Sequence, residues 1–557
     1  MEQNKRLKDL KESLLVNLGE MKLIRGRTEG VRWEACSLVK HRTKVFNIGE
    51  SKIPDRKMFT NVPSEAVRTA VNGIMGYLIS QNIRWFNMTV KTKDNTPSDD
   101  VYGANDYIEI TVSTILNTFN QNGFYPSTHL ATMDSFVQGT SAEFIKDDID
   151  NERINYDTIN PEEFYISEDE YRNVNTFYRV YEIPIKIAYQ RWGDDLPKEV
   201  LRMVRNGAGH QIIKFLHAIY PREDATKKGE AIISTEKEYA SIHYSFVGDE
   251  VFKESGFDEF PIAVHRWSLN GTSPYGSCPV IELIDEIKKL DKMALQYSTA
   301  IDKYVDPPVF APEIMKGRLN LNPGARNYAN IAQVGAPQLF PTTLDLNHLA
   351  TEIQNQSRVL QQALYSDLFN ILMRQDQQRT ATEVREIKGE GLVLLSSIIG
   401  NMQEEKITPL VLRTFNILLK GGVLPPLPVE LKKKSVNGEV RVELDGPLAQ
   451  NMKAYHQTTG ITQGMQAMAA VMQLNPDSQV NVDFDELMRQ AISGNGMPQK
   501  IIREKAEVKK IKQKQQEMLQ QQAELQQQQM QADAINKMGS TQGTTPQQMA
   551  QGQVGRQ

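Results

Sequence analysis

The segment Gly271-Thr-Ser-Pro-Tyr-Gly276-Ser277 is the first place where residue types and spacing suggest catalytic chemistry. A phosphate-binding loop needs a lysine directly after its second glycine, because the ammonium group pairs with the phosphates. Ser277 stands at that position. A nucleophile elbow needs a glycine two residues after its serine, and Tyr275 stands there. The segment therefore favours neither nucleotide binding nor serine-dependent hydrolysis.

Other titratable residues give no pattern of a catalytic or metal site. No two of the eight histidines have the spacing of metal ligands; they stand at positions 41, 129, 210, 217, 243, 265, 348 and 456. The acidic clusters at 99–100 and 147–150 are better explained as solvated loops, although a Ca²⁺ or Mg²⁺ ion at an oligomer interface stays open. Cys36 and Cys278 are too few for a disulfide framework. We expect no enzymatic activity and no cofactor.

Composition indicates a soluble protein of several domains. The chain has 557 residues, of which 40% are apolar and 24% charged. It lacks a run of about eighteen apolar residues, and its first residues are polar, so we expect neither a membrane span nor a signal peptide. The net charge of −5 is unlike that of a tight DNA binder. The basic run 432–434 predicts a solvated turn, with a DNA-facing role as the alternative.

Two long amphipathic helices dominate the middle of the chain. Apolar residues recur every three or four positions over 279–305, and the helix must stop at Asp306-Pro307-Pro308. The second helix is predicted over 345–369. The Pro- and Gly-rich excursion between them, 307–344, is too short for a core of its own. We expect it to pack on neighbours, which favours an oligomer.

The N-terminal half predicts an α+β fold with antiparallel strands. Helices are expected over 4–40, from Ser64 (as N-cap) to Gln81, over 106–120 and over 130–144, with a strand near Trp85. From 155 to 264, short β-rich runs alternate with turns, and one helix lies near 184–192.

Helices also dominate the C-terminal half, so the whole chain is predominantly helical. A helix over 382–420 should be bent by Gly389, Gly391, Gly400 and Pro409. A hairpin is expected across Asn437-Gly438. Further helices are predicted over 449–472, 483–494 and 499–538. The last of these has a thin apolar stripe and needs partner helices, so a disordered tail is its alternative. Residues 539–557 are expected to be disordered.

Three ordered blocks carry a resemblance to a known family. They are GTSPYGSCPV with AIDKYVDPP (271–308), RTATEV (379–384) and DGPLA (445–449). Together they resemble the portal, or head-to-tail connecting, proteins of short-tailed bacteriophages. The resemblance implies a closed ring of about twelve subunits at one capsid vertex, through which double-stranded DNA is packaged and ejected. It also implies a virion component, assembled in the host cytoplasm, whose partners are the terminase large subunit, a tail adaptor, and the major capsid and scaffolding proteins.

The resemblance also implies a division of the chain into portal domains. These are a wing (1–276), a first stem helix (277–305), a clip (306–344), a second stem helix (345–370), a tunnel loop (371–381), a wing helix with hairpin (382–445), a helical crown or barrel (446–538) and a tail (539–557).

Candidate functional residues follow from these domains. The tunnel-loop candidates beside the DNA are Arg374, Gln375, Gln377, Gln378 and Arg379. The stem candidates lining the channel are Lys288, Lys292 and Glu352, and the clip candidates for adaptor docking are Lys316, Arg318 and Arg326.

Alternatives to these assignments remain. The two loop arginines have a second interpretation, as helix caps or partners of Asp376 and Glu383. Another virion protein, such as an adaptor or internal core protein, is the alternative for the whole chain, and an enzyme with an unfamiliar site is a more distant one.

Overall fold

The computed structural model describes most of the chain up to residue 446. The described residues are 2–40, 58–92, 104–148, 153–223, 234–269, 271–306, 309–310, 313, 338–339, 346–373, 398–426, 428, 435–446, 508, 511, 514, 518 and 520–521. The chain separates into two compact units, and the larger comprises Met1–Asn95 and Gly103–Tyr455. In the smaller unit, each described position within 499–538 is helical, as predicted there.

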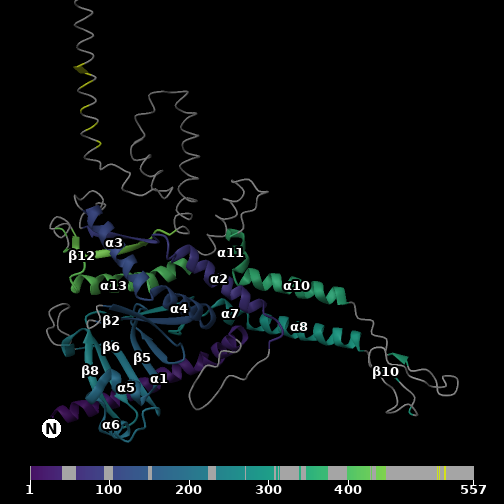
Figure 1. Cartoon of the computed structure of the whole chain (residues 1–557), viewed down its shortest axis with the longest axis horizontal. Coiled ribbons are helices and arrows are strands. Elements are labelled where there is room, and N and C mark those ends of the chain that lie inside the picture. The colour runs from purple at the N-terminus through teal and green to yellow at the C-terminus, as the bar shows by residue number, and fades with distance from the viewer. Residues whose placement is uncertain are drawn as a thin grey trace, which may run out of the picture. The chain divides into compact units, whose positions relative to one another are not determined.

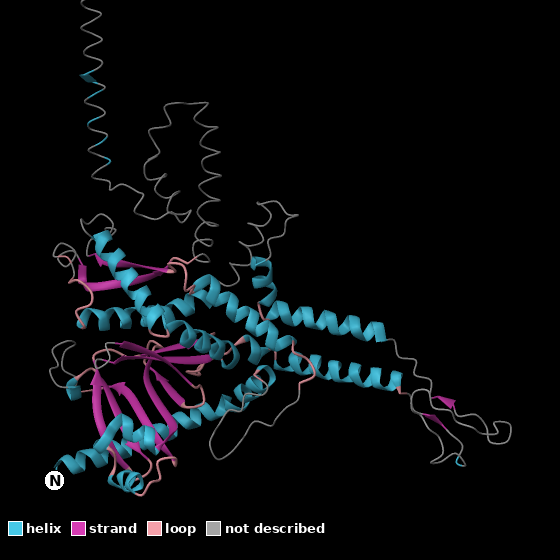
Figure 2. Cartoon of the chain, viewed as in Figure 1, coloured by secondary structure: helices cyan, strands magenta, loops and turns pink. Residues whose placement is uncertain are grey.

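The larger unit is a mixed helical and antiparallel β structure (Figures 1 and 2). Its helices are α1 (Glu2–Val39), α2 (Val62–Leu78), α3 (Ala104–Gln121), α4 (Phe124–Gln138), α5 (Ile185–Trp192), α6 (Lys198–Arg205), α7 (Pro279–Glu282), α8 (Ile284–Val305), α10 (Leu346–Ala363), α11 (Ser366–Met373) and α13 (Thr408–Lys420). Its strands are β1 (Phe86–Thr92), β2 (Thr140–Asp148), β3 (Arg153–Ile159), β4 (Phe164–Glu168), β5 (Val174–Pro184), β6 (Ile212–Pro221), β7 (Tyr239–Ser245), β8 (Glu250–Phe257), β9 (Ile262–Arg266), β10 (Val309–Phe310), β11 (Gln338–Leu339) and β12 (Ser435–Leu444).

Two sheets form the β part of this unit. One has five strands in the order β4-β5-β6-β7-β8, and the other has three in the order β3-β2-β9. Leu14 and Leu18 of α1 pack with Tyr178 and Leu216 of the five-stranded sheet, so this side of α1 is buried against it. Other side chains of the two sheets share a further core. Helices α5 and α6 cover the end of the five-stranded sheet near Phe215.

A separate and larger core joins the helices to the three-stranded sheet. Its centre is a group of stacked aromatic rings, in which Phe119 and Phe124 lie 3.9 Å apart between ring centroids. Trp85 stacks on both of these rings, and its Nε1 donates to the Tyr125 hydroxyl at 3.3 Å. The same core reaches the bases of α8 and α10 through Ile287 and Leu360. The long helices are therefore anchored at one end in the body of the protein.

The two long helices lie side by side and project from the helical layer (Figure 1). The first is interrupted at Leu283, so the predicted helix 279–305 is the short α7 followed by α8. The second is interrupted at Leu364-Tyr365, where Tyr365 has φ 60° and α11 begins. Between the helices, β10 pairs with β11 in antiparallel fashion.

Two predictions at helix starts and ends are wrong. The helix expected over 130–144 ends at Gln138, because Gly139 takes a left-handed conformation (φ 80°) and the chain continues as β2. The buried side chains of Thr140–Ala142 fit a strand between two others better than a helix surface. Ser64 is not an N-cap, since α2 already begins at Val62; its hydroxyl donates to the Val39 carbonyl at 2.7 Å.

The hairpin expected across Asn437-Gly438 is also wrong. β12 is one strand that pairs with β1, Val440 opposite Val90 and Ser435 opposite Thr92. The Asn-Gly pair falls between these positions, where the register of β12 on β1 is irregular, so it does not form the turn of a hairpin.

The helix expected over 382–420 is present where the structure describes it. Residues 398–402 are helical, Gln403–Ile407 form a π-helical turn, and α13 follows. Pro409 has no N–H to donate to an earlier carbonyl, which explains the widened turn just before it. α13 ends at Lys420, as predicted, and Gly422 just after it takes φ 69°.

Candidate functional site

The segment 271–279 joins the sheets to the long helices at their base. Gly276 crosses the chain at Gly139 so closely that a Cβ on Gly276 would lie 2.5 Å from the Gly139 carbonyl oxygen. The Gly276 N–H donates to the Thr140 hydroxyl at 3.0 Å. Pro279 then opens α7, where its missing N–H costs nothing. Glycine and proline in this segment therefore have a packing role.

Tyr275 connects this segment to two other elements. Its hydroxyl accepts a hydrogen bond from the Ile166 N–H of β4 at 3.2 Å. The Arg32 guanidinium of α1 lies over its ring, 4.3 Å from the centroid. Burial lowers the pKa of Arg32 to about 10, so the cation is still charged at neutral pH. The tyrosine thus fixes α1, β4 and the start of α7 against one another.

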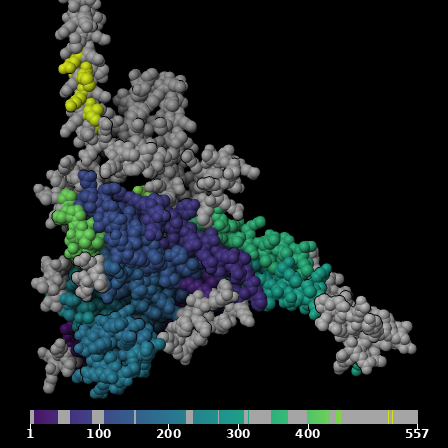
Figure 3. Space-filling view, viewed as in Figure 1, coloured from purple at the N-terminus to yellow at the C-terminus, as the bar shows by residue number. Residues whose placement is uncertain are grey.

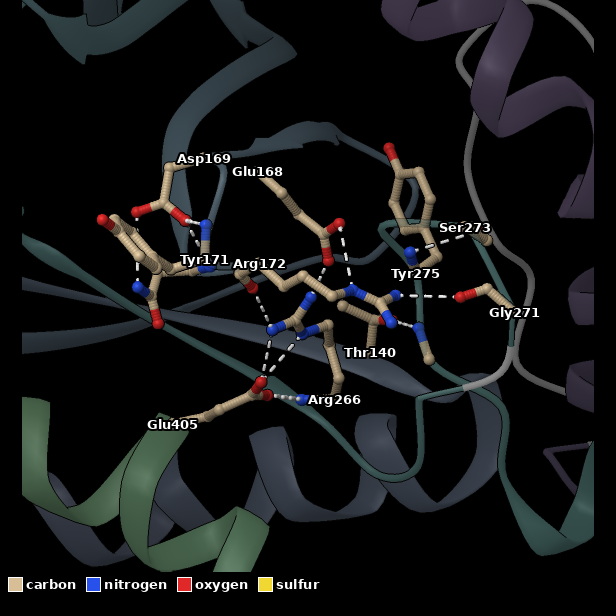
Figure 4. Close-up of polar contacts among 12 residues, drawn as sticks. Thr140, Glu168, Asp169, Tyr171, Arg172, Arg266, Gly271, Ser273, Tyr275 and Glu405 are labelled. Carbon is tan, nitrogen blue, oxygen red and sulfur yellow. Dashed lines mark hydrogen bonds and ion pairs between the residues drawn. The ribbon is translucent and has the colours of Figure 1, made fainter.

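Arg266, at the end of β9, is the centre of a buried polar cluster beside this segment (Figure 4). Its guanidinium pairs with Glu168 of β4 and with Glu405 of the π-helical turn. Its backbone N–H also donates to Glu405 at 2.8 Å. Arg172, in a left-handed conformation (φ 66°), accepts from Arg266 through its carbonyl and donates to the Gly271 carbonyl at 3.0 Å. The cluster ties the turn after β4 and the π-helical turn to the 271–279 segment.

Lys406, the next residue along the π-helical turn, is fully buried. Its Nζ lies 2.9 Å from Glu143 Oε1, and it donates to the Thr132 hydroxyl at 2.9 Å and the Thr128 carbonyl at 3.1 Å. Burial lowers the pKa of Lys406, and the Glu143 carboxylate raises it in opposition. Two adjacent residues of the π-helical turn, Glu405 and Lys406, therefore form ion pairs with different strands. These two ion pairs hold the turn in its π-helical conformation.

The long helices contact each other through apolar and polar residues. Gln356 of α10 donates to Glu286 at 2.6 Å and accepts from Lys289 at 3.3 Å, so it links two charged residues of α8. Buried apolar residues of α8 are concentrated toward its base, at Ile284, Ile287 and Leu290.

Large apolar side chains are exposed on the two helices, most of them toward the outer half of α8. Tyr304 and Val305 are 67% and 76% exposed, and Leu295 and Ile301 are exposed as well. On α10, Val359 is exposed near the base of the helix. In the space-filling view, the surface of these helices stands away from the body (Figure 3). A helix pair that exposes this much apolar surface needs a further surface to cover it.

The structure places three of the predicted site residues, all on the two long helices. Lys288 pairs with Glu34 of α1 at 2.7 Å, so its ammonium is partly neutralised within the chain. Lys292 and Glu352 are exposed and have no ion-pair partner among the described residues. Lys316, Arg318 and Arg326, and the 374–379 segment with Arg374, Gln375, Gln377, Gln378 and Arg379, lie outside the described residues.

Comparison with known proteins gives the family. Residues 11–502 match the family described as Bacteriophage head to tail connecting protein. The chain is 25% identical over 550 residues to the "Portal protein" of Salmonella phage epsilon15, covering 96% of each chain. It is 26% identical over 488 residues to the "Probable portal protein" of Bordetella phage BPP-1, covering 84% of this chain and 86% of that protein. The chain belongs to the bacteriophage head to tail connecting protein family.

Membership confirms the resemblance carried by the three sequence blocks. The general function is that of a portal or head-to-tail connector, a structural component of the virion. Among the described residues, no group of His, Cys, Asp and Glu could hold a metal ion. In the same part of the chain, no helix is long and apolar enough to cross a membrane.

Burial raises the pKa of Cys36 to about 11 and that of Cys278 to about 12, so both thiols are protonated at neutral pH.

The sequence alone does not predict the buried ion pairs of Arg266 and Lys406. Arg266 lies just after the predicted β-rich region 155–264, and Lys406 lies within the predicted helix 382–420. A usable signal lay in Glu404-Glu405-Lys406, three consecutive charges in a predicted helix shortly before Pro409. Such a run of charges indicates either a solvated face or a pair of buried charges with distant partners.

Proposed function

We propose that the chain closes with about eleven copies of itself into a ring around a channel for double-stranded DNA, at one vertex of the capsid. In this proposal α8 and α10 are the stem, the segment between them is the clip, and the sheets with α1–α6 are the wing. The terminase large subunit docks on the clip during packaging, and a tail adaptor docks there later. The major capsid and scaffolding proteins contact the outside of the ring.

The observation that carries the proposal is the exposed apolar surface of α8 and α10. In a cyclic ring, one face of a subunit packs on a different face of its neighbour, so every subunit can cover such a surface. Ile301 and Val305 are four residues apart on α8 and therefore lie on the same side of the helix. The sequence relationship to two portal proteins over most of their length supports the same assembly.

Charge is consistent with a channel through which DNA moves. The net charge of −5 means that phosphates meet few fixed cations, and each fixed contact would have to be broken during translocation. Lys288 is held by Glu34, whereas Lys292 and Glu352 are exposed and alternate in sign. Weak contacts of this kind suit sliding better than binding. In the same proposal the 371–381 segment projects into the channel as the tunnel loop.

Native mass spectrometry with negative-stain imaging of the full-length protein tests the assembly. The proposal expects rings of about twelve subunits with a central hole. Ile301→Glu with Val305→Glu should release monomers, because two carboxylates per subunit would be buried without partners. Gln296→Glu with Ser298→Glu is the matched control, since both positions are exposed on the same helix and the charge change is equal.

Three outcomes of that experiment have different consequences for the proposed ring. Rings in the wild type and the control, with monomers in the apolar-face variant, support the proposal. A stable monomer or dimer of the wild type at every salt concentration contradicts the ring. Rings in all three proteins contradict the role of the exposed α8 surface.

A further inference from the structure

A large cleft lies in the β part of the molecule, away from α8 and α10. It has a volume of about 1530 Å³ and is bounded by β2 and β3, by the five-stranded sheet, and by the end of α13. These elements lie on the left of Figure 1. Arg413 and Lys420 of α13 pair with Glu259 and Asp258, both at the end of β8, so two walls of the cleft are held together by ion pairs.

One wall of the cleft contains an unpaired sheet edge. β3 pairs with β2 in the three-stranded sheet, and among the described residues no strand pairs with its other side. Five consecutive residues of β3, 153–157, line the cleft. Successive side chains of a strand point to opposite faces. Because all five residues line the cleft, the cleft contacts both faces of β3 and the edge between them. About half of the N–H and C=O groups of such an edge point toward the cleft.

The cleft is more basic than the chain as a whole. Its lining holds eight Lys or Arg residues and five Asp or Glu residues, in a chain whose net charge is −5. Lys146, Arg153 and Arg191 come from β2, β3 and α5, and none of them has an ion-pair partner among the described residues. These cations are available to a ligand without breaking an existing pair.

Uncharged polar and aromatic groups complete the lining. His217 and His243 stack with centroids 4.1 Å apart, and Trp192 lies against His243. His243 Nδ1 and Arg413 Nε are buried without a hydrogen-bond partner among the described residues. Burial, together with Lys253, Lys146 and Arg191, lowers the pKa of His243 to about 3, so this ring is neutral at physiological pH. Aromatic surface beside unpaired polar groups fits a ligand with both apolar and polar side chains.

We propose that this cleft binds an extended, acidic segment of a partner protein, which adds as a strand to the free edge of β3. Backbone hydrogen bonds to β3 supply affinity, and the alternate side chains of the segment supply specificity. Its carboxylates meet Lys146, Arg153 and Arg191, and its apolar residues meet the aromatic wall. A nucleic acid fits less well, because it has no peptide N–H and C=O groups that could pair with the free edge of β3.

Fluorescence anisotropy with a labelled ten-residue peptide of alternating Glu and Val, about the length of the longest strands here, tests the proposal. The full-length protein should bind it, and Lys146→Glu, Arg153→Glu and Arg191→Glu combined should weaken binding by about tenfold or more. Lys8→Glu, Lys186→Glu and Lys198→Glu combined is the matched control. These three lysines lie outside the cleft lining, and the charge change is the same. A labelled DNA duplex at the same ionic strength is the competing probe.

Two N-methylated peptides test the strand itself. One carries methyl groups on the amides of all Glu residues and the other on those of all Val residues. Only one of these sets can face β3 in an added strand, so one peptide should lose binding and the other should keep it. Equal binding of both peptides, equal loss in the control variant, no binding by the wild type, or tighter binding of the DNA duplex would each overturn the proposal. None of these outcomes depends on whether the chain forms a ring.

Discussion

The junction around Arg266 and Lys406 and the outer part of α8 and α10 differ in how far one chain completes them. At the junction, each of these buried cations has a carboxylate partner from a distant part of the same chain. On the outer helices, apolar side chains such as Tyr304 and Val305 are exposed to solvent. The junction is therefore completed within one chain, whereas the outer helices leave apolar surface uncovered. Substitutions should affect folding in the first region and assembly in the second.

The largest effect on stability is expected at Lys406. Lys406→Met leaves the Glu143 carboxylate buried without its cation, which should destabilise the protein by about 3–5 kcal/mol. Denaturant unfolding followed by circular dichroism measures this change. Lys406→Met combined with Glu143→Met is the matched control, because removing both charges should recover much of the loss. Equal stability of the single variant and the wild type would show that the pair does not anchor the π-helical turn.

The sequence predicted the long helices and the family, but not the ion pairs at the junction. The 3.6-residue pattern located the long helices because their apolar faces are local features of the sequence, and α8 ends where Asp306-Pro307-Pro308 requires. Three sequence blocks were enough to identify the family, which the comparisons confirm.

Long-range pairing is where the sequence-based prediction was incomplete. Asn437-Gly438 carries a strong local turn signal, yet β12 pairs with β1 more than three hundred residues away, and that pairing decides the structure. The helix expected past Gln138 was wrong for the same reason, because β2 gains partners in β3 and β9. The partners of Arg266 and Lys406 are equally distant in sequence, so no local pattern indicates them.

The second largest effect is expected where Gly276 meets Gly139. Gly276→Ala places a Cβ 2.5 Å from a backbone oxygen that cannot easily move, and overpacking of this kind costs about 1–3 kcal/mol. Gly26→Ala in α1 is the control: it has open space around it, and alanine is the better helix former there. The thermal midpoint should fall for the first variant and stay level or rise for the second. A level midpoint for both would mean that the crossing at Gly276 is not rigid.

A smaller effect is expected from His265, which is buried between the two ion pairs. Burial, with the nearby Lys406 and Arg266 cations, lowers its pKa from 6.5 to about 3. The unfolded chain therefore binds a proton below about pH 6.5 that the folded chain does not bind, so acid destabilises the fold. From about pH 7.5 to about pH 5.5, this histidine alone should remove about 1.4 kcal/mol of unfolding free energy. His265→Leu should make the fall in stability over that range shallower by this amount, and an unchanged slope would contradict the assignment.

The smallest effect is expected on the long helices, at Lys288. Its pair with Glu34 is about one-third exposed on both sides, and pairs of this kind contribute about 0–1 kcal/mol. Lys288→Gln should therefore leave the unfolding free energy nearly unchanged, with Glu34→Gln as a control that breaks the same pair from α1. A loss as large as that of Lys406→Met would remove the contrast between the two regions. If the loss is small, the charges of α8 contribute little to the stability of the fold. These charges can then be explained by what contacts the helices.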